Sequence, residues 1–328
     1  MKTSLVLGAG GFIGSHMVKK LKNEGYFVRA IDIKKPEFSE SYADEFITYD
    51  LTNPKNFVEY FTINNSNFDE IYQYAADMGG AGYIFTGDND SNVMTNSALV
   101  NLNTLKTIQL LNEKYKNSKT KVFYASSACI YPEHNQIDPN NPNCAEDSAY
   151  PAMPDSEYGW EKLFSERLFL SYHRNFSIKV KIARFHNIFG PEGTFQGGKE
   201  KVPAAMCRKI ALADNEIEVW GDGKQTRSFL YIDECINATR KLMESEETGP
   251  FNIGSEEMVS INELVDIVSK IADKKISIKH IDGPLGVRGR NSDNKLIQEK
   301  LGWSYSMTLS EGMKITYDWI FEQLNKIE

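Results

Sequence analysis

The chain has 328 residues, of which 41% are hydrophobic, and its formal net charge is −8. A chain of this length can bury a sizeable core. Its acidic balance argues against nucleic acid as a partner, because phosphate backbones are held by excess Lys and Arg. No apolar run approaches the roughly 20 residues of a membrane span. Four unpaired cysteines and five scattered histidines predict neither disulfides nor a metal site, which favours the cytoplasm.

The first half of the chain alternates short apolar, β-branched runs with stretches of helical periodicity. This alternation is typical of βαβ units on a parallel sheet. It predicts an α/β fold in which residues 1–186 form a Rossmann-like, doubly wound parallel sheet. The strands are expected at Ser4–Leu7, Phe27–Ile31, Phe46–Tyr49, Glu70–Tyr74, Val122–Ala125 and Val180–Arg184, with helices at Ile13–Glu24, Asn92–Lys116 and Glu157–Arg174.

The second half has more glycine-rich turns and shorter helices. Residues 187–328 are expected to form mostly a smaller, C-terminal substrate-binding lobe, with one strand near 251–254 returning to the first lobe. The polar stretch Pro139–Pro154 is expected to be a loop at the sheet edge. The helices of this half are expected at Pro203–Ala211, Asn262–Ala272 and Leu309–Leu324.

A glycine-rich segment directly follows the first predicted strand and opens a helix. Its backbone amides and the helix N-terminus can hold a pyrophosphate. An ordinary tight turn would use glycines too, but Asp32 ends the second strand about 20 residues on, where a carboxylate can accept the ribose hydroxyls. The cofactor-binding residues of the glycine segment are expected to be Gly8, Gly11, Phe12, Ile13 and Gly14.

The choice between NAD and NADP depends on the residues after the second strand. The Asp32 carboxylate would repel the 2′-phosphate of NADP, whereas Lys34 and Lys35 could tolerate it or simply lie in a solvated turn. We therefore expect NAD as the cofactor. Asp50 after the third strand is a candidate adenine contact, although an Asp there is at least as often a turn residue.

Tyr158 and Lys162 lie four residues apart, on one face of a predicted helix. A neighbouring ammonium stabilises a phenolate, which could accept the proton of a sugar hydroxyl as hydride leaves for NAD. Ser127 ends a strand of the same sheet and can hydrogen-bond the reacting oxygen. The three side chains fit one redox site.

This ordered set of motifs resembles the extended short-chain dehydrogenase/reductase family, and the resemblance covers nearly the whole chain. It implies that Asn101 lies near the cofactor, that Asn187 contacts a sugar nucleotide and that Arg227 holds its diphosphate. The expected activity is NAD-dependent epimerisation of a nucleotide sugar through a transient ketone.

A ketone makes the C–H bonds on both flanking carbons acidic, so inversion needs a second acid/base pair near Ser127. Cys129 follows two residues later, and strand alternation would direct it to the same side as Ser127. An isolated Cys is more often a small buried filler, but this position favours a general base. Lys201, in a glycine-flanked segment before a helix, is the candidate acid, while Lys199 is expected to be solvated or to contact a phosphate.

Several longer segments closely resemble the family of GDP-mannose 3,5-epimerases. They are ADMGGAG, ASSACIYP, RFHNIFGPEGT, GGKEKVPAA, WGDGKQTRSF and GVRGRNSDN. The resemblance implies that Cys129 and Lys201 exchange protons at positions 3 and 5 of a GDP-linked hexose, and that Gly82 and Arg290 bind the substrate. The products implied are GDP-L-galactose and GDP-L-gulose. The chain departs from that family at Phe195-Gln196, where Trp-Lys is usual, and at Lys199, where Arg is usual.

Three other functions remain open at this point. They are a GDP-4-keto-6-deoxymannose epimerase-reductase, a simple 4-epimerase or 4,6-dehydratase, and a non-catalytic NAD-binding regulator. The first usually has a His where this chain has Lys201, a dehydratase usually has an acidic pair after Ser127, and a regulator has no need of Tyr158 and Lys162. Related enzymes are usually homodimers, and the helices at Asn92–Lys116 and Glu157–Arg174 could supply that interface or pack on the sheet.

Overall fold

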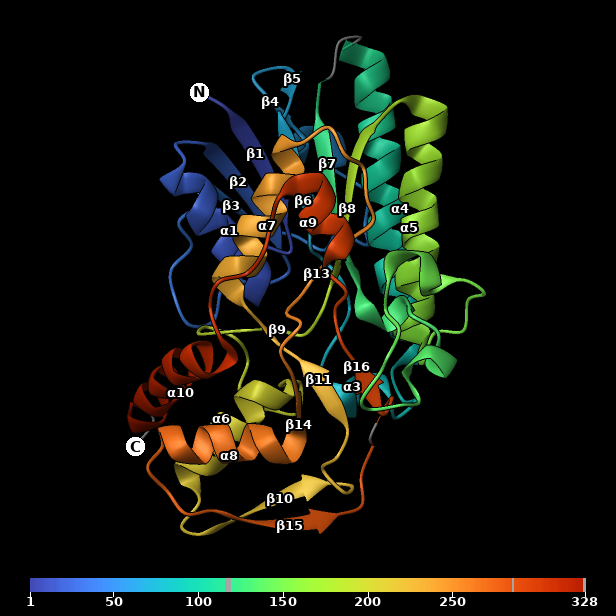
Figure 1. Cartoon of the computed structure of the whole chain (residues 1–328). Coiled ribbons are helices and arrows are strands. Elements are labelled where there is room, and N and C mark those ends of the chain that lie inside the picture. Colours follow the sequence, from blue (N-terminus) through green and yellow to red (C-terminus); the bar gives the residue numbers. More distant parts are fainter. Residues whose placement is uncertain (116–118, 285, 327–328) are drawn as a thin grey trace.

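A seven-stranded sheet lies at the centre of the molecule (Figure 1). The computed structural model describes residues 1–115, 119–284 and 286–326. All neighbouring strands pair in parallel, in the order β13-β8-β7-β6-β1-β2-β3. The predicted α/β fold with a doubly wound parallel sheet is therefore confirmed. The strands are β1 (Thr3–Leu7), β2 (Phe27–Asp32), β3 (Glu45–Thr48), β6 (Glu70–Gln73), β7 (Lys121–Ser127), β8 (Lys179–Phe185) and β13 (Phe251–Ile253).

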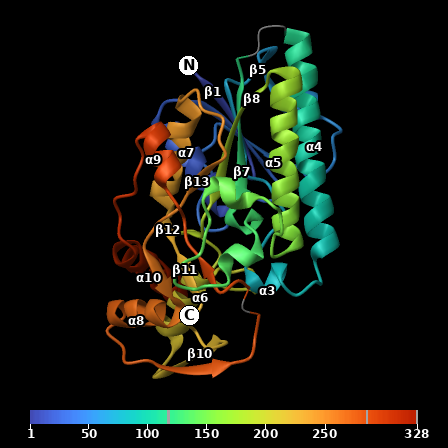
Figure 2. The ribbon, with the colours of Figure 1, turned by 45° about the vertical axis from the view of Figure 1, so that its right-hand side comes forward.

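Helices cover both faces of this sheet, which explains why the inner strands are buried along nearly their whole length (Figure 2). On one face, α4 (Asp90–Tyr115) and α5 (Glu157–Phe176) pack against each other and bury Leu105, Ile108 and Phe169 beside β1 and β7. On the other face lie α1 (Phe12–Asn23), α7 (Ile232–Glu244) and α9 (Lys295–Leu301).

Three segments beyond residue 186 pack on the sheet. β13 extends the sheet beside β8, in register from Phe251 opposite Ala183. Helix α7 contacts α1 and β8, and α9 contacts β13. Neither α7 nor α9 is among the helices expected from the sequence, so the chain crosses between the two halves more often than expected.

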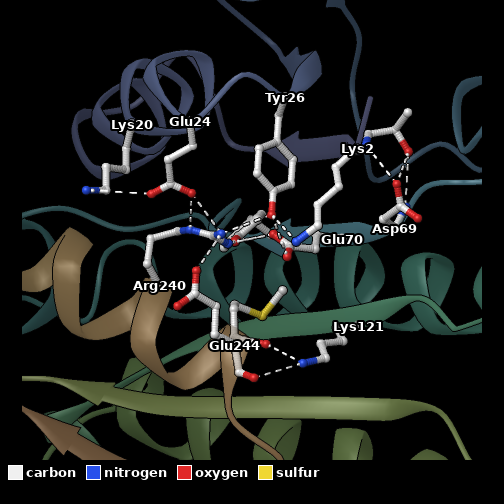
Figure 3. Close-up of polar contacts among 12 residues, drawn as sticks. Lys2, Lys20, Glu24, Tyr26, Asp69, Glu70, Lys121, Arg240 and Glu244 are labelled. Carbon is white, nitrogen blue, oxygen red and sulfur yellow. Dashed lines mark hydrogen bonds and ion pairs between the residues drawn. The ribbon is translucent and has the colours of Figure 1, made fainter.

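Buried charges attach α7 to the amino-terminal edge of the sheet (Figure 3). Arg240 forms ion pairs with Glu70 at 2.6 Å and with Glu24 at 2.8 Å, and its guanidinium donates to the Tyr26 hydroxyl at 3.0 Å. The Arg240 side chain is only 5% exposed. This network joins α7, α1 and β6 on the side of the sheet opposite the carboxyl ends of its strands.

The smaller lobe follows below the carboxyl edge of the sheet in Figure 1. Its helices α6 (Val202–Leu212), α8 (Ile261–Ile271) and α10 (Leu309–Asn325) pack on one another and match three predicted helices. Two short sheets complete it: β10 (Glu216–Trp220) with β15 (Ser277–Ile281), and β11 (Thr226–Ser228) between β14 (Met258–Ser260) and β16 (Gly289–Arg290).

The remaining elements are short. The predicted loop Pro139–Pro154 contains one 3-10 turn at Glu146–Ala149. The predicted end of the long helix at Lys116 lies outside the described residues. Among the residues that the structure describes, no helix is long and apolar enough to span a membrane. The short elements are α2 (Phe57–Tyr60), β4 (Thr62–Ile63), β5 (Ser66–Asn67), α3 (Ala81–Ile84), β9 (Ile188–Phe189), β12 (Leu230–Tyr231) and 3-10 turns at Ala128–Ile130 and Glu133–Gln136.

Candidate active site

The glycine segment forms a tight turn between β1 and α1 that leaves no room for side chains. A Cβ atom on Gly8 would lie 2.6 Å from the Ala75 nitrogen, and φ at Gly8 is +81°. A Cβ on Gly14 would lie 2.1 Å from the Gly8 oxygen. Helix α1 begins at Phe12 with Gly11 as its N-cap and receives no side-chain cap there. Its first amides are therefore suited to an anion such as a diphosphate.

Asp32 joins this turn to the residues after β2. Its Oδ2 accepts from the Gly10 amide at 2.9 Å and its Oδ1 accepts from the Lys34 amide at 3.1 Å. Burial raises the pKa of this carboxyl, against the opposing effect of the two amides. The carboxylate thus lies beside the proposed diphosphate site, where the ribose of a dinucleotide would need an acceptor.

These features fit NAD, because the close-packed glycines, the uncapped helix and the half-buried Asp32 carboxylate each correspond to one part of the dinucleotide. Asp50 is less clearly placed: its Oδ1 accepts from the Thr52 amide at 2.9 Å and from the Thr52 hydroxyl at 2.8 Å. Those bonds are typical of a turn residue. The adenine contact expected of Asp50 stays a prediction.

Tyr158 and Lys162 lie together at the base of α5, against the end of β7. The Lys162 Nζ donates to the Ala125 carbonyl at 3.0 Å and lies 5.6 Å from the centre of the Tyr158 ring. Tyr158 hydrogen-bonds Ser127. Burial raises the pKa of Tyr158 and lowers the pKa of Lys162. The three predicted redox residues, Ser127, Tyr158 and Lys162, therefore lie together, and we call their position the redox corner.

The start of α5 explains this placement. The Ser156 hydroxyl caps the helix by accepting from the Gly159 amide at 3.2 Å, which puts Tyr158 in the first turn. A Cβ on Gly159 would lie 2.2 Å from the Cys129 carbonyl oxygen. Glycine at this position therefore allows the helix to approach the segment that carries Cys129.

Cys129 does not continue the strand, so the alternation argument for its direction is wrong. β7 ends at Ser127, and Ala128–Ile130 form a 3-10 turn because the Ser127 hydroxyl accepts from the Cys129 amide at 3.2 Å. The turn nevertheless keeps the thiol beside the redox corner. Its Sγ lies 3.1 Å from Nη1 of Arg290.

Arg290 is held by three partners at once. Its Nε donates to Gln136 at 2.6 Å, its Nη2 forms an ion pair with Asp155 at 2.6 Å, and its Nη1 donates to Cys129. Burial lowers the pKa of this guanidinium, but Cys129, Asp155 and Cys144 raise it more, so the net pKa is raised. Arg290, predicted as a substrate contact, therefore also fixes the thiol.

Lys201 approaches the same place from the smaller lobe. It is the N-cap residue of α6, and the residue as a whole is exposed, although protein surrounds its ammonium group. The surrounding protein lowers its pKa by desolvation, and Cys129 opposes this by raising it. The preceding segment is fixed by α3, since the Gly80 amide donates to the Lys199 carbonyl at 3.1 Å. The Lys199 Nζ lies 4.0 Å from the centre of the Tyr83 ring.

The other predicted substrate residues lie at the junction of the lobes. Asn187 has φ of +46°, and its amide donates to the Ser228 carbonyl at 2.8 Å. Arg227 donates to the carbonyls of Thr226 and Val287, and burial lowers its pKa to about 10. Gly82 is exposed at α3, facing the edge of Trp220 at β10.

Asn101 lies deeper than the other predicted cofactor residues. It is 1% exposed, and its amide donates to Glu161 at 3.1 Å and to Ser165 at 2.9 Å. Its oxygen accepts from Gln73 at 2.8 Å. These bonds join α4, α5 and β6 behind the redox corner, so direct contact with the cofactor stays a prediction.

Comparison with known proteins identifies the family. A model of the NAD dependent epimerase/dehydratase family matches residues 4–254. The chain belongs to this family. GDP-mannose 3,5-epimerase of Arabidopsis thaliana is 46% identical over 98% of this chain and 82% of its own length. These findings confirm the predicted family, NAD as the cofactor and an epimerase as the class of enzyme.

Solved structures agree with the fold. UDP-glucuronic acid 4-epimerase from Bacillus cereus, in complex with UDP-glucuronic acid and NAD, is 28% identical with a TM-score of 0.77, over 98% of this chain and 99% of its own. UDP-glucose 4-epimerase from Thermotoga maritima has a TM-score of 0.84 at 23% identity, over 98% of this chain and 99% of its own. The Rossmann-like fold is thus confirmed.

Sequence reasoning missed the residues that hold the site in shape. Gly159, Asp155 and Gln136 position the start of α5 and Arg290, as described above. A glycine in the first turn of a predicted helix is a visible signal of close packing, so Gly159 could have been found. Asp155 and Gln136 carry no such signal, because they meet Arg290 across 135 and 154 residues of sequence.

Proposed function

We propose that this enzyme is a GDP-mannose 3,5-epimerase. The observation that carries the proposal is the position of Cys129, fixed by Arg290 and Ser127 at the redox corner, with Lys201 reaching the same place from the smaller lobe. A redox site alone suits any member of the family. A thiol and an ammonium on different lobes suit inversion at carbons that flank a ketone, because one can remove a proton and the other can deliver one from the opposite side.

The redox residues act on the 4-hydroxyl. The Tyr158 phenolate accepts the hydroxyl proton, Ser127 holds the oxygen, and the Lys162 ammonium stabilises the negative charge of the phenolate. NAD held at the glycine turn and Asp32 would supply the acceptor for the hydride of the sugar carbon and the source from which that hydride is restored. Cys129 then removes a proton from a carbon next to the ketone, and the Lys201 ammonium supplies a proton to the opposite face.

The remaining residues bind the nucleotide sugar. We assign Asn187 and Gly82 to contacts with the sugar nucleotide, and Arg227 and Arg290 to its diphosphate. Residues 1–186, with the strand at 251–254, form the NAD-binding part of this proposal, and residues 187–328 form most of the substrate-binding part. Relatives of this chain with 46% and 45% identity are named GDP-mannose 3,5-epimerase, which supports guanine as the base.

The test is solvent exchange in heavy water. The purified protein, given GDP-mannose without added NAD, is expected to return hexose carrying deuterium at positions 3 and 5, with GDP-L-galactose and GDP-L-gulose among the products. Cys129→Ser should keep its NAD and lose exchange at both positions. Absence of label at both positions in the native enzyme would overturn the proposal.

A panel of substrates separates the alternatives. GDP-mannose should be turned over faster than UDP-glucose, UDP-glucuronic acid and dTDP-glucose. Net reduction of a 4-keto-6-deoxy sugar by NADPH would favour the epimerase-reductase instead. Release of water from the hexose would favour a dehydratase.

We infer a homodimer formed through α4 and α5. A groove on the α5 side is lined by Trp160, Leu163 and Phe164 of that helix and by Tyr150 of the preceding loop, and Trp160 and Phe164 are 41% and 49% exposed. Exposed aromatic side chains beside such a groove are typical of interfaces. A double Trp160→Glu/Phe164→Glu variant should elute as a monomer in light-scattering chromatography, whereas Phe321→Glu on α10, which replaces an equally exposed ring, should not change the mass.

We place the enzyme in the cytoplasm because of its cysteines. All four thiols are free, and three of them are buried. Free thiols suit a reducing compartment. Alkylation of the protein in its native cells, followed by mass spectrometry, should find all four as thiols, and a disulfide between any two would contradict this location.

A further inference from the structure

One carboxylate connects three segments around the glycine turn. Glu192, in the segment after β9, accepts from Lys19 Nζ of α1 at 2.5 Å and from the Ser39 hydroxyl, between β2 and β3, at 2.9 Å. Glu192 has φ of +64°, a conformation that non-glycine residues seldom adopt. The two hydrogen bonds from Lys19 and Ser39 lower the pKa of this carboxyl against the effect of burial, so it is charged at neutral pH.

Glu192 lies at the edge of a hollow beside the glycine turn, where the dinucleotide is proposed to bind. This hollow is lined on one side by Gly10, Gly11, Phe12 and Ser15, and on the other by residues of two crossing segments. The crossing segments contribute Lys34, Pro36, Glu37, Phe38, Glu192 and Thr194. Through its bond to Ser39, Glu192 thus joins the two crossing segments at the edge of this hollow. The start of α1 lines the other side of the hollow.

The two crossing segments share an anchor on the C-terminal helix. The ring of Phe38 lies 5.0 Å from Trp319 of α10 and 5.6 Å from Phe195, and Phe195 lies 5.7 Å from Trp319, measured between ring centres. In Figure 1 the connection from β2 to β3 descends toward α10. Aromatic packing therefore fixes both segments to α10, at Phe38 and Phe195. The polar contacts of Glu192 join the same segments beside the glycine turn.

We propose that Lys19, Ser39 and Glu192 form a clasp that must open for NAD to enter or leave. The clasp itself requires only that NAD binds at the glycine turn. Its benefit rests on the proposed function: epimerisation consumes no net oxidant, so losing the dinucleotide during a turnover would leave an oxidised sugar with no source of hydride. A polar clasp on an aromatic anchor can open locally without disturbing the core.

The test measures NAD exchange in the absence of any sugar nucleotide, so its outcome does not depend on the proposed substrate. The fluorescent analogue 1,N6-etheno-NAD is loaded and then displaced with excess NAD, and the rates of release and entry are followed by stopped flow. In Glu192→Gln and Lys19→Met, both rates should rise at least tenfold, because a gate limits movement in both directions. The NAD retained after gel filtration, measured in acid extracts, should fall.

The matched control is Glu45→Gln, which breaks the Arg29–Glu45 ion pair between β2 and β3, also 2.5 Å long but outside the hollow. This control should leave both rates unchanged. Unchanged rates in both clasp variants would overturn the proposal. Faster release with unchanged entry would also overturn it, because Glu192 would then be an ordinary contact with NAD rather than part of a gate.

Discussion

The Sγ atom of Cys129 lies 3.1 Å from the Nη1 atom of Arg290. The two residues are 161 positions apart and belong to different halves of the chain. Because Asp155 and Gln136 also hydrogen-bond Arg290, its guanidinium is held in one orientation and positions the thiol. The position of the Cys129 thiol thus depends on a residue that the sequence associates only with substrate binding.

The first prediction concerns the contact between Arg290 and Cys129. Arg290→Lys should lower deuterium exchange from solvent into GDP-mannose by roughly 10²-fold, because a lysine cannot donate in three fixed directions at once. NAD bound per subunit should stay the same. Exchange is measured by mass spectrometry in heavy water. A variant with normal exchange and only a raised KM would mean that Arg290 serves the diphosphate alone.

The second prediction separates the two groups of the acid/base pair. Without the acid, Lys201→Met should still exchange protons through Cys129, but each proton should return to the face from which it left. Deuterium should therefore enter recovered GDP-mannose while GDP-L-gulose and GDP-L-galactose fall below detection. NMR of the recovered sugar gives both label and configuration. Cys129→Ser is the matched control and should show neither label nor inversion, and inversion persisting in Lys201→Met would assign the acid to another residue.

The third prediction is a pH dependence set by the same lysine. Burial lowers the pKa of Lys201 from its ordinary value of 10.5. The ammonium form, which supplies the proton, is fully present below the lowered pKa and is lost as pH rises through it. Inversion should therefore decline on the alkaline side before an ordinary lysine would deprotonate, while solvent exchange into GDP-mannose continues. The ratio of inverted product to labelled substrate measures this directly, and a ratio that is flat up to pH 10.5 would contradict it.

The fourth prediction concerns stability far from the site. Arg240→Met should lower the free energy of unfolding by roughly 3–5 kcal/mol, because it leaves the buried Glu70 carboxylate without its cation. Urea unfolding provides the measurement. Lys314→Met, which breaks an ion pair with side chains 63% and 51% exposed, is the control and should change stability by at most about 1 kcal/mol. If the two variants lower the free energy of unfolding equally, the Arg240 network does not stabilise the packing of α7 on the sheet.

The sequence predicted the elements whose signal is local. The glycine turn, Asp32 and the helical spacing of Tyr158 and Lys162 are each set within one or two elements, so periodicity and turn chemistry located them. Helix α7 was missed although it carries a buried stripe at Ile232, Cys235, Ile236 and Thr239 with helical spacing. This spacing is a local signal from which the helix can be predicted.

The contacts that shape the site could not be predicted in this way. The contacts of Arg290 join segments more than 100 residues apart, and neither residue of such a pair shows in its own neighbourhood where its partner lies. The direction of Cys129 illustrates the limit. Strand alternation assumed that β7 continues past Ser127, whereas the Ser127 hydroxyl binds the Cys129 amide and turns the chain.

Asn252 is the strongest example of such a contact. It is fully buried on β13, and its oxygen accepts from Tyr131 at 2.7 Å and hydrogen-bonds His186 at 2.9 Å. Its amide donates to the carbonyls of Cys144 at 2.8 Å and Asp293 at 3.1 Å. One side chain thus joins the segments that carry Cys129, Asn187 and Arg290.

The last prediction follows from that position. Asn252→Leu keeps the branching of the side chain at Cγ but is larger and leaves these four groups without this partner, so the free energy of unfolding should fall by roughly 2–4 kcal/mol. Because the segments it joins carry two residues of the proposed site, Cys129 and Arg290, solvent exchange should fall about tenfold at unchanged NAD content, the lower end expected when a supporting residue is lost. Asn103→Leu removes an amide that donates to the carbonyls of Leu51 and Thr52, outside the three segments that Asn252 joins, and it should cost only about 1 kcal/mol with normal exchange. If the two variants lose stability and exchange equally, Asn252 contributes packing alone, and the alignment of the three segments must come from Arg290 and its partners.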